Sequence, residues 1–171
     1  EAAGSYKHAT TLRPSFTEAH YNLGVIQQLL GNLNEAEASY ERAAALRPDY
    51  AEAHNNLGIV LQGIGRFDDA RARFQQAIDS KPDYAEAHRH LVTTKKFDHE
   101  DDQYSKMIEL HLDNSISDER RCHINFGLAK ACEDLENFEK AFTHYTEGNG
   151  LRKKLLNYDI NEDVETFRKI K

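Results

Sequence analysis

The chain has 171 residues, of which 39% are hydrophobic and 30% charged, as expected for a folded globular protein rather than a disordered tail. Its formal net charge of -7 argues against nucleic-acid binding, which depends on Lys and Arg side chains that neutralise phosphates. The sequence contains no run of about 18 apolar residues, so no membrane contact is predicted, and no signal peptide opens the chain.

The two cysteines, Cys122 and Cys132, form neither a CxxC pair nor a disulfide framework. This suits a reducing compartment, so we expect a cytoplasmic protein in which both cysteines are small buried side chains. Because the sequence starts at Glu1 without a methionine, it leaves room for an upstream segment that carries a targeting signal.

A 34-residue period dominates the first half of the chain. The triplet Glu-Ala-His occurs at 18–20, 52–54 and 86–88, and prolines occur at 14, 48 and 82. Such self-similarity indicates one supersecondary unit stacked on copies of itself.

Within one unit, apolar residues at helical spacing run from Leu23 to Leu30, pause at Gly31 and resume from Ala36 until Pro48. Each unit is therefore predicted to be two helices and a turn. Small residues on both helices, Gly24 and Ala36 in one unit and Gly58 and Ala70 in the next, predict close packing beside Tyr40 and Phe74. Predicted N-caps are Asn34 and Asp68 for the second helices, and Asp49 and Asp83 for the first helices that follow.

The series Leu23-Gly24, Ala36, Tyr40, Ala43 and Pro48, repeated as Leu57-Gly58, Ala70, Phe74, Ala77 and Pro82, resembles the tetratricopeptide repeat, TPR. This resemblance implies an all-α fold, a right-handed α-solenoid of antiparallel helix pairs, that serves as a protein–protein interaction scaffold. The sequence departs from the family pattern where His20, His54 and His88 replace an aromatic residue. We expect these histidines to pack between helices.

The repeat pattern predicts the organisation of the whole chain. Residues 1–16 are the second helix of a truncated repeat, and residues 17–50 and 51–84 are full repeats. Residues 85–121 form an irregular helical pair, residues 122–156 a last TPR-like pair, and residues 157–171 a C-terminal helix. Asp101 and Ser117 are expected to start helices in the irregular region.

The segment from Phe126 to the end resembles the region that joins TPR arrays to the catalytic domain of bacterial TPR-sulfotransferases, through features such as Glu147-Gly148-Asn149 and Tyr158-Asp159. This resemblance implies an alternative function, an accessory, substrate-positioning or dimerisation region of a sulfotransferase. The glycine- and serine-containing loop that would cradle the phosphosulfate donor is absent from these 171 residues.

The sequence predicts neither catalysis nor a metal or cofactor site. It has no glycine-rich phosphate loop, no G-x-S-x-G and no H-E-x-x-H motif. A zinc site built from His88 with His90 or His99 is disfavoured, because residues two apart on a helix point to different faces.

A peptide-binding face is the site that we predict. Asn22 and Asn56 occupy equivalent places on successive first helices, and an amide side chain pairs with both the donor and the acceptor of a peptide backbone. Their surroundings resemble the TPR region of protein O-GlcNAc transferases, which implies an asparagine ladder on a concave surface that His90 interrupts. Further candidates on the same side are Tyr21, Asn55, Arg89, Gln28, Gln62 and Lys96.

The favoured hypothesis is a non-catalytic scaffold for a protein or peptide ligand. A homodimer is a smaller prediction, because the helix from Glu1 to Leu12 has lost the first helix of its own repeat and could pair with a second copy.

Overall fold

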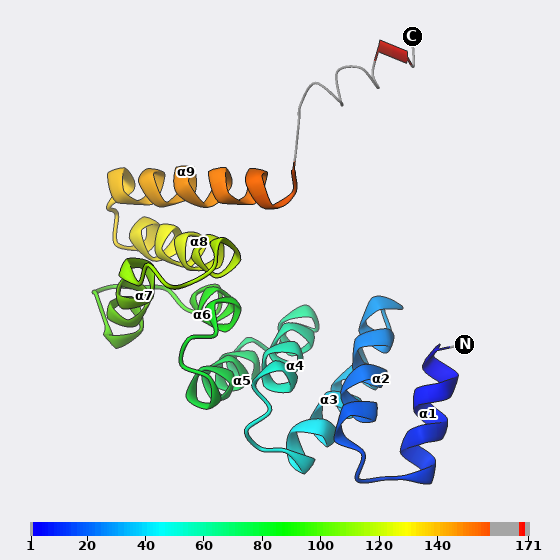
Figure 1. Ribbon diagram of the computed structural model, residues 1–171. Helices are drawn as coiled ribbons and strands as arrows, with labels where there is room; N and C mark the ends of the chain where they lie inside the picture. The colour runs from blue at the N-terminus through cyan, green and yellow to red at the C-terminus, as the bar shows by residue number, and fades with distance from the viewer. Residues whose placement is uncertain (1, 158–167, 170–171) are drawn as a thin grey trace. The chain divides into compact units, whose positions relative to one another are not determined.

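The computed structural model describes residues 2–157 and 168–169, and every regular element within them is an α-helix (Figure 1). The helices are α1 (Ala2–Leu12), α2 (Thr17–Leu29), α3 (Leu33–Leu46), α4 (Ala51–Gly63), α5 (Phe67–Ser80), α6 (Ala85–Val92), α7 (Asp102–Leu112), α8 (Asp118–Asp134) and α9 (Phe138–Leu155). The predicted all-α solenoid of helix pairs is confirmed. The predicted C-terminal helix, residues 157–171, lies almost wholly outside the described residues.

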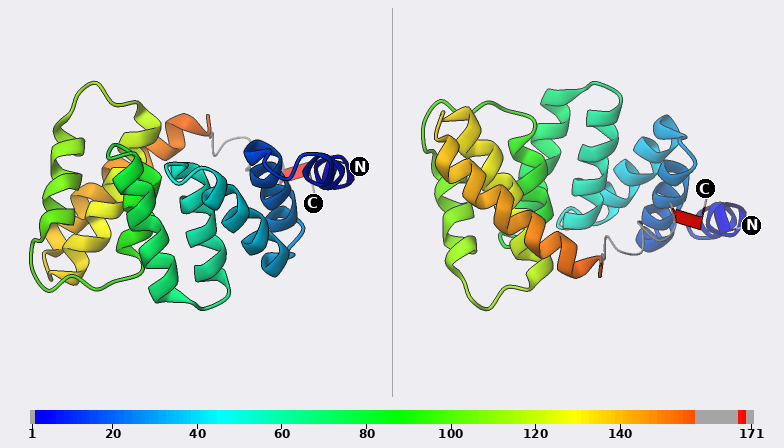
Figure 2. Two further views of the ribbon diagram at one scale, coloured as in Figure 1. Left: turned by 90° about the horizontal axis from the view of Figure 1, so that it is seen from below. Right: turned by 90° about the horizontal axis from the view of Figure 1, so that it is seen from above.

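The chain divides into two compact units, Glu1–Asp98 and His99–Lys171. In the first unit each helix packs against the next one along the chain, and α4 also contacts α2 and α6 directly. Figure 2 gives two further views of this stack of helix pairs. Because α2, α4 and α6 touch in series, they form one side of the unit, which we call the first-helix face.

Close packing within each pair depends on a glycine opposite an aromatic ring. A Cβ atom at Gly24 would lie 2.8 Å from Cδ1 of Tyr40, and one at Gly58 would lie 2.5 Å from Cε1 of Phe74. Both rings are fully buried. An aromatic side chain of this size buries roughly 150–250 Å², worth about 4–6 kcal/mol of gross transfer free energy. The packing predicted from the sequence is confirmed.

A Schellman turn joins the two helices of each repeat. Gly31 has a φ of 77°, the amide of Asn32 donates to the carbonyl of Gln27 at 2.9 Å, and the amide of Gly31 donates to Gln28 at 3.0 Å. The same pair of hydrogen bonds recurs around Gly65, whose φ is 85°. A left-handed residue at this point is the usual helix-ending device, and glycine adopts it without strain.

The N-caps predicted for the two repeats are wrong. Helix α3 begins at Leu33 after Asn32, and α5 begins at Phe67 after Arg66, so Asn34 and Asp68 lie inside the first turns. Tyr50 and Tyr84, rather than the preceding aspartates, precede α4 and α6, and none of these four cap residues makes a side-chain capping bond. The Schellman turn already fixes where the second helices start, so no capping side chain is required there.

The loops between repeats are tied by repeated charge contacts. The ammonium of Lys81 lies 3.3 Å from the carboxylate of Glu52 and 4.9 Å from the ring centre of Tyr84. One repeat earlier, Arg47 pairs with Glu18 in the same way. These groups are partly exposed, so each pair contributes at most about 1 kcal/mol.

The second unit is built around the α8–α9 pair, with α7 packed on α8. The expected caps are confirmed here, since the side chain of Asp101 accepts from the amide of Tyr104 at 2.9 Å and that of Ser117 accepts from Arg120 at 3.3 Å. Cys122 and Cys132 are 2% and 1% exposed, as predicted. The division between units falls inside residues 85–121, so α6 and α7 belong to different units.

Candidate functional site: the first-helix face

The centre of the first-helix face is a hydrogen-bonded network that links α2, α4 and α6. The amide of Asn56 on α4 donates to the hydroxyl of Tyr21 on α2 at 3.1 Å. The neighbouring Asn55 accepts from Nδ1 of His90 on α6 at 3.0 Å. Both links join residues 35 positions apart, so each first helix is fastened to the next one by the same geometry.

The partners of His90 identify its neutral form. Nδ1 donates to Asn55, and Nε2 accepts from the guanidinium of Arg89 at 3.2 Å. An imidazole that donates through one nitrogen and accepts through the other carries a single proton. The tautomer is assigned from these neighbours. His90 thus interrupts the run of asparagines, as predicted, but continues the network between helices.

The two asparagines of the predicted ladder, Asn22 and Asn56, differ in how many hydrogen-bond donors and acceptors of their amides are unused. Asn22 is half-buried on α2, and among the residues that the structure describes its amide makes no hydrogen bond. The Asn56 oxygen receives one long bond of 3.4 Å from Asn55. Because an amide oxygen has two lone pairs, Asn56 keeps acceptor capacity as well.

Several other predicted residues are buried in the fold or hydrogen-bonded to other side chains of it. Asn55 is only 1% exposed, so a ligand cannot reach it in this arrangement. Gln28 accepts the hydroxyl of Tyr40 at 2.8 Å, and Gln62 donates to Thr93 at 3.0 Å. These side chains hold the face together, and burial raises the pKa of the Tyr40 phenol, so this group is neutral at ordinary pH.

The third helix of the first-helix face, α6, is shorter than the other two. Helix α6 has eight residues, whereas α2 and α4 have 13 each. Lys96, one period after Gln62, therefore lies beyond the end of α6 and is exposed. Arg89 is half-buried on α6, and its Nε atom is buried without a hydrogen-bond partner among the described residues.

At the α2 end of this face the half-buried rings of Tyr21 and Tyr50 pack beside each other, and Tyr21 also packs on the fully buried ring of Tyr40. The ring of Tyr21 lies 5.8 Å from that of Tyr40 and 4.9 Å from that of Tyr50, measured between centroids. Burial raises the pKa of Tyr21 above its ordinary value, and the hydrogen bond from Asn56 opposes this shift. The face therefore combines amide and phenol groups with the half-buried rings of Tyr21 and Tyr50, and it also holds the guanidinium of Arg89.

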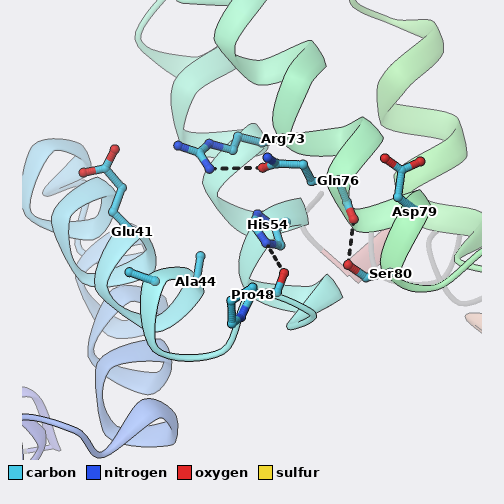
Figure 3. Close-up of a pocket in the computed structure, with 9 residues that line it drawn as sticks. Glu41, Ala44, Pro48, His54, Arg73, Gln76, Asp79 and Ser80 are labelled. Carbon is cyan, nitrogen blue, oxygen red and sulfur yellow. Dashed lines mark hydrogen bonds between the residues drawn. The ribbon is translucent and has the colours of Figure 1, made fainter.

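The opposite side of the first unit holds a groove that the sequence analysis missed. It has a volume of about 340 Å³ and lies between α3 and α5, with Glu41 on one wall and Arg73, Gln76 and Asp79 on the other (Figure 3). Its floor is His54, whose Nε2 lies 2.9 Å from the Pro48 carbonyl oxygen. The wall charges are of both signs, and Arg73 already donates to Gln76 at 3.1 Å. The groove lies between the second helices of the two repeats, α3 and α5, and its lining side chains do not point to one kind of ligand.

The helices that the structure describes form an all-α solenoid of antiparallel helix pairs. Residues 16–83 match the family model of the tetratricopeptide repeat. This part of the chain, residues 16–83, consists of tetratricopeptide repeats. No curated protein matches it in the sequence comparison.

Solved structures share the architecture at low sequence identity. A crystal structure of MamA has a TM-score of 0.64 and 21% identity, with 91% of this chain and 90% of that chain covered. PilF of Pseudomonas aeruginosa has a TM-score of 0.64 and 17% identity, covering 80% and 61%. An O-GlcNAc transferase mutant of Thermobaculum terrenum has a TM-score of 0.52 and 25% identity, covering 75% of this chain but 22% of that one.

Two further predictions concern a membrane and a sulfotransferase catalytic domain. None of the described helices is long and apolar enough to cross a membrane. The relation to sulfotransferases stays a prediction, because the segment that would lead into a catalytic domain, residues 157–171, falls almost entirely outside the described part of the chain.

Proposed function

We propose that the chain is a non-catalytic scaffold that binds an extended peptide of a partner protein across the first-helix face. The observation that carries this proposal is the Asn22 amide, which is held half-buried on α2 with its donors and acceptor unused by the described residues. The Asn22 amide is not among the buried atoms that lack a partner, so water can pair with it in the free chain and a peptide can replace that water. A peptide backbone offers one donor and one acceptor per residue.

The spacing of the face supports an extended ligand. Neighbouring helices in such a stack lie about 8–10 Å apart, a distance that three residues of extended chain cover. Asn22 on α2 and Asn56 on α4 would thus contact peptide groups about three residues apart. Since both amides bind backbone rather than side chains, the groove would tolerate many sequences, and the ring of Tyr21 would add apolar contact between them.

The test uses phage-displayed random peptides selected on the full chain. A selected peptide, labelled with a fluorophore, is titrated against wild type and the Asn22→Ala variant by fluorescence anisotropy. We expect a loss of roughly tenfold in affinity, because one net hydrogen bond is worth about 1–1.5 kcal/mol. The control is Gln76→Ala, an exposed residue in the groove on the other side.

Two results would contradict the proposal. One is full affinity in Asn22→Ala for every selected peptide, and the other is a loss of affinity in Gln76→Ala. Asn56→Ala is a weaker probe, because it also removes the bond to Tyr21 that fastens α4 to α2. The affinity of the Asn56→Ala variant should be measured only after circular dichroism has shown that this variant keeps the wild-type fold.

We further propose self-association through α1. This helix packs on α2 but contains no buried residue, and Leu12 at its end is 74% exposed. A second copy would cover this surface. Sedimentation velocity over a wide concentration range tests the idea, with Leu12→Lys as the variant that should restore the monomer. A monomer at all concentrations of the wild type would contradict it.

A further inference from the structure

The second unit brings together three side chains that ligate metal ions. His111 lies in the last turn of α7, and His144 and Glu147 lie three positions apart on α9. One potential ligand atom from each of the three lies within 4.8 Å of the other two. Nε2 of His111 is 3.9 Å from the Glu147 carboxylate, and the two imidazole rings meet edge to face with centroids 5.1 Å apart.

The ring of His144 is oriented by a buried amide. Its Nδ1 lies 2.9 Å from Oδ1 of Asn125, which is fully buried on α8. The nitrogen of that amide donates to the carbonyl of Arg121 at 3.1 Å, so the oxygen is the end that faces the imidazole. Nδ1 of His144 therefore donates its proton to Asn125, and Nε2 keeps a free lone pair. A second ring nitrogen bonded to an amide or carboxylate is the arrangement that fixes metal-binding histidines.

The backbone that carries His111 is also held in place. The guanidinium of Arg121 donates to the carbonyl of His111 at 2.6 Å and to that of Asp113 at 2.8 Å. One arginine on α8 thus satisfies the end of α7, where helix carbonyls lack partners within the helix. The same helix, α8, positions both histidines, one through Arg121 and the other through Asn125.

We propose that His111, His144 and Glu147 form a binding site for Zn²⁺, with water as the fourth ligand. Two imidazoles and one carboxylate are a ligand set that zinc accepts, and three protein ligands leave one position open. With bonds of about 2.0–2.1 Å, tetrahedral ligands lie about 3.4 Å apart, so the ion would draw the three groups together by roughly an ångström. The site is accessible, since the side chains of Glu147 and His111 are 53% and 20% exposed.

The ion would have a structural role in this unit. Helices α7 and α9 both pack on α8. A metal held by His111 from one and by His144 and Glu147 from the other would cross-link them over α8.

The test is isothermal titration of the full chain, without an affinity tag and treated with chelator, against ZnCl₂ alone. We expect one Zn²⁺ per chain and a higher melting temperature in its presence. His111→Gln and Glu147→Gln should each weaken zinc binding by at least roughly 10- to 100-fold. That is the typical loss when only a hydrogen-bond partner of a metal ligand is removed, and these variants remove a ligand itself. Matched controls are His8→Gln and Glu139→Gln, which change exposed residues elsewhere and should bind as wild type does.

The proposal is overturned if no zinc binds, or if the two ligand variants bind as tightly as the two controls. A measurement on wild type alone removes any doubt about variant folding. Diethylpyrocarbonate modifies accessible histidines, and peptide mapping by mass spectrometry locates them. Zinc should protect His111 and His144 but not His8, and equal modification with and without zinc would also contradict the site.

Discussion

Nε2 of His54 lies 2.9 Å from the carbonyl oxygen of Pro48, in the loop that precedes its own helix. The same contact occurs at His88 with Pro82, at 2.9 Å, and at His20 with Pro14, at 3.0 Å. The ring fills the position between helices that was predicted for it and also donates to a carbonyl just beyond the preceding helix. The contact therefore recurs with the 34-residue period, and in each repeat the histidine side chain satisfies a backbone carbonyl in the loop before its own helix.

Replacing His88 with Phe should separate these two roles. His88 is fully buried, so the variant keeps an aromatic ring but leaves the Pro82 carbonyl without that donor. We expect the free energy of unfolding to fall by about 1–3 kcal/mol, measured by urea denaturation and circular dichroism. His20→Phe should cost less, since His20 is only half-buried and water can reach Pro14. Equal costs at both sites would contradict this account, because the cost should depend on how deeply the carbonyl is buried.

The pH dependence of stability should include a contribution from His54. Burial lowers its pKa below the ordinary value of 6.5, because a second proton would sit on Nδ1, which is buried without a partner among the described residues. The unfolded chain therefore takes up this proton first. The contribution to stability is complete above about pH 6.5 and is lost as the pH falls toward the folded pKa, by at most about 1.4 kcal/mol per pH unit.

His54→Gln retains a donor for Pro48 but no longer titrates. We expect the gap in unfolding free energy between wild type and this variant to narrow between about pH 7.5 and pH 5.5. His144, whose pKa is also lowered by burial, titrates in both proteins and cancels in the difference. A gap of the same size at both pH values would mean that the pKa of His54 is unchanged on folding.

Glu136 occupies a position where glycine is the favoured residue. Its φ is 59°, and the Schellman bonds seen at Gly31 and Gly65 recur here, with the amide of Asn137 donating to Cys132 at 2.8 Å. A side chain in the left-handed region costs about 1 kcal/mol relative to glycine. Glu136→Gly should therefore raise the melting temperature, measured by calorimetry. The reverse change, Gly65→Ala, should lower it, and a destabilised Glu136→Gly variant would contradict this account.

Regular features of the chain were predictable from the sequence because each depends on neighbours at fixed spacing. The glycine opposite Tyr40 and the caps at Asp101 and Ser117 are of this kind. The caps at Asn34 and Asp68 were predicted wrongly, because residue preference says little about a helix start that a preceding turn has already fixed.

The polar sites were less predictable, because they depend on which helices meet. The burial of Asn55 follows from His90, 35 residues later, which covers and binds it. His111 and His144 are 33 residues apart on helices that both pack on α8, so no local sequence motif predicts that they meet in one metal site. The only sequence signal was the i, i+3 spacing of His144 and Glu147, which is too common to be informative alone.

Gly58→Ala is the sharpest test of the packing within a repeat. The new methyl group would lie 2.5 Å from Cε1 of Phe74, a ring that is fully buried and has no room to move. We expect a loss of about 1–3 kcal/mol in unfolding free energy, even though alanine favours the helix by up to about 1 kcal/mol. Gly63→Ala, at the end of the same helix, is the control, because its methyl group would meet only Leu33 at an ordinary 3.6 Å. That variant should be neutral or slightly more stable. The double variant Gly58→Ala with Phe74→Leu should recover part of the loss, since the smaller side chain makes room for the methyl group, and a purely additive result would show that the two positions do not compete for the same space.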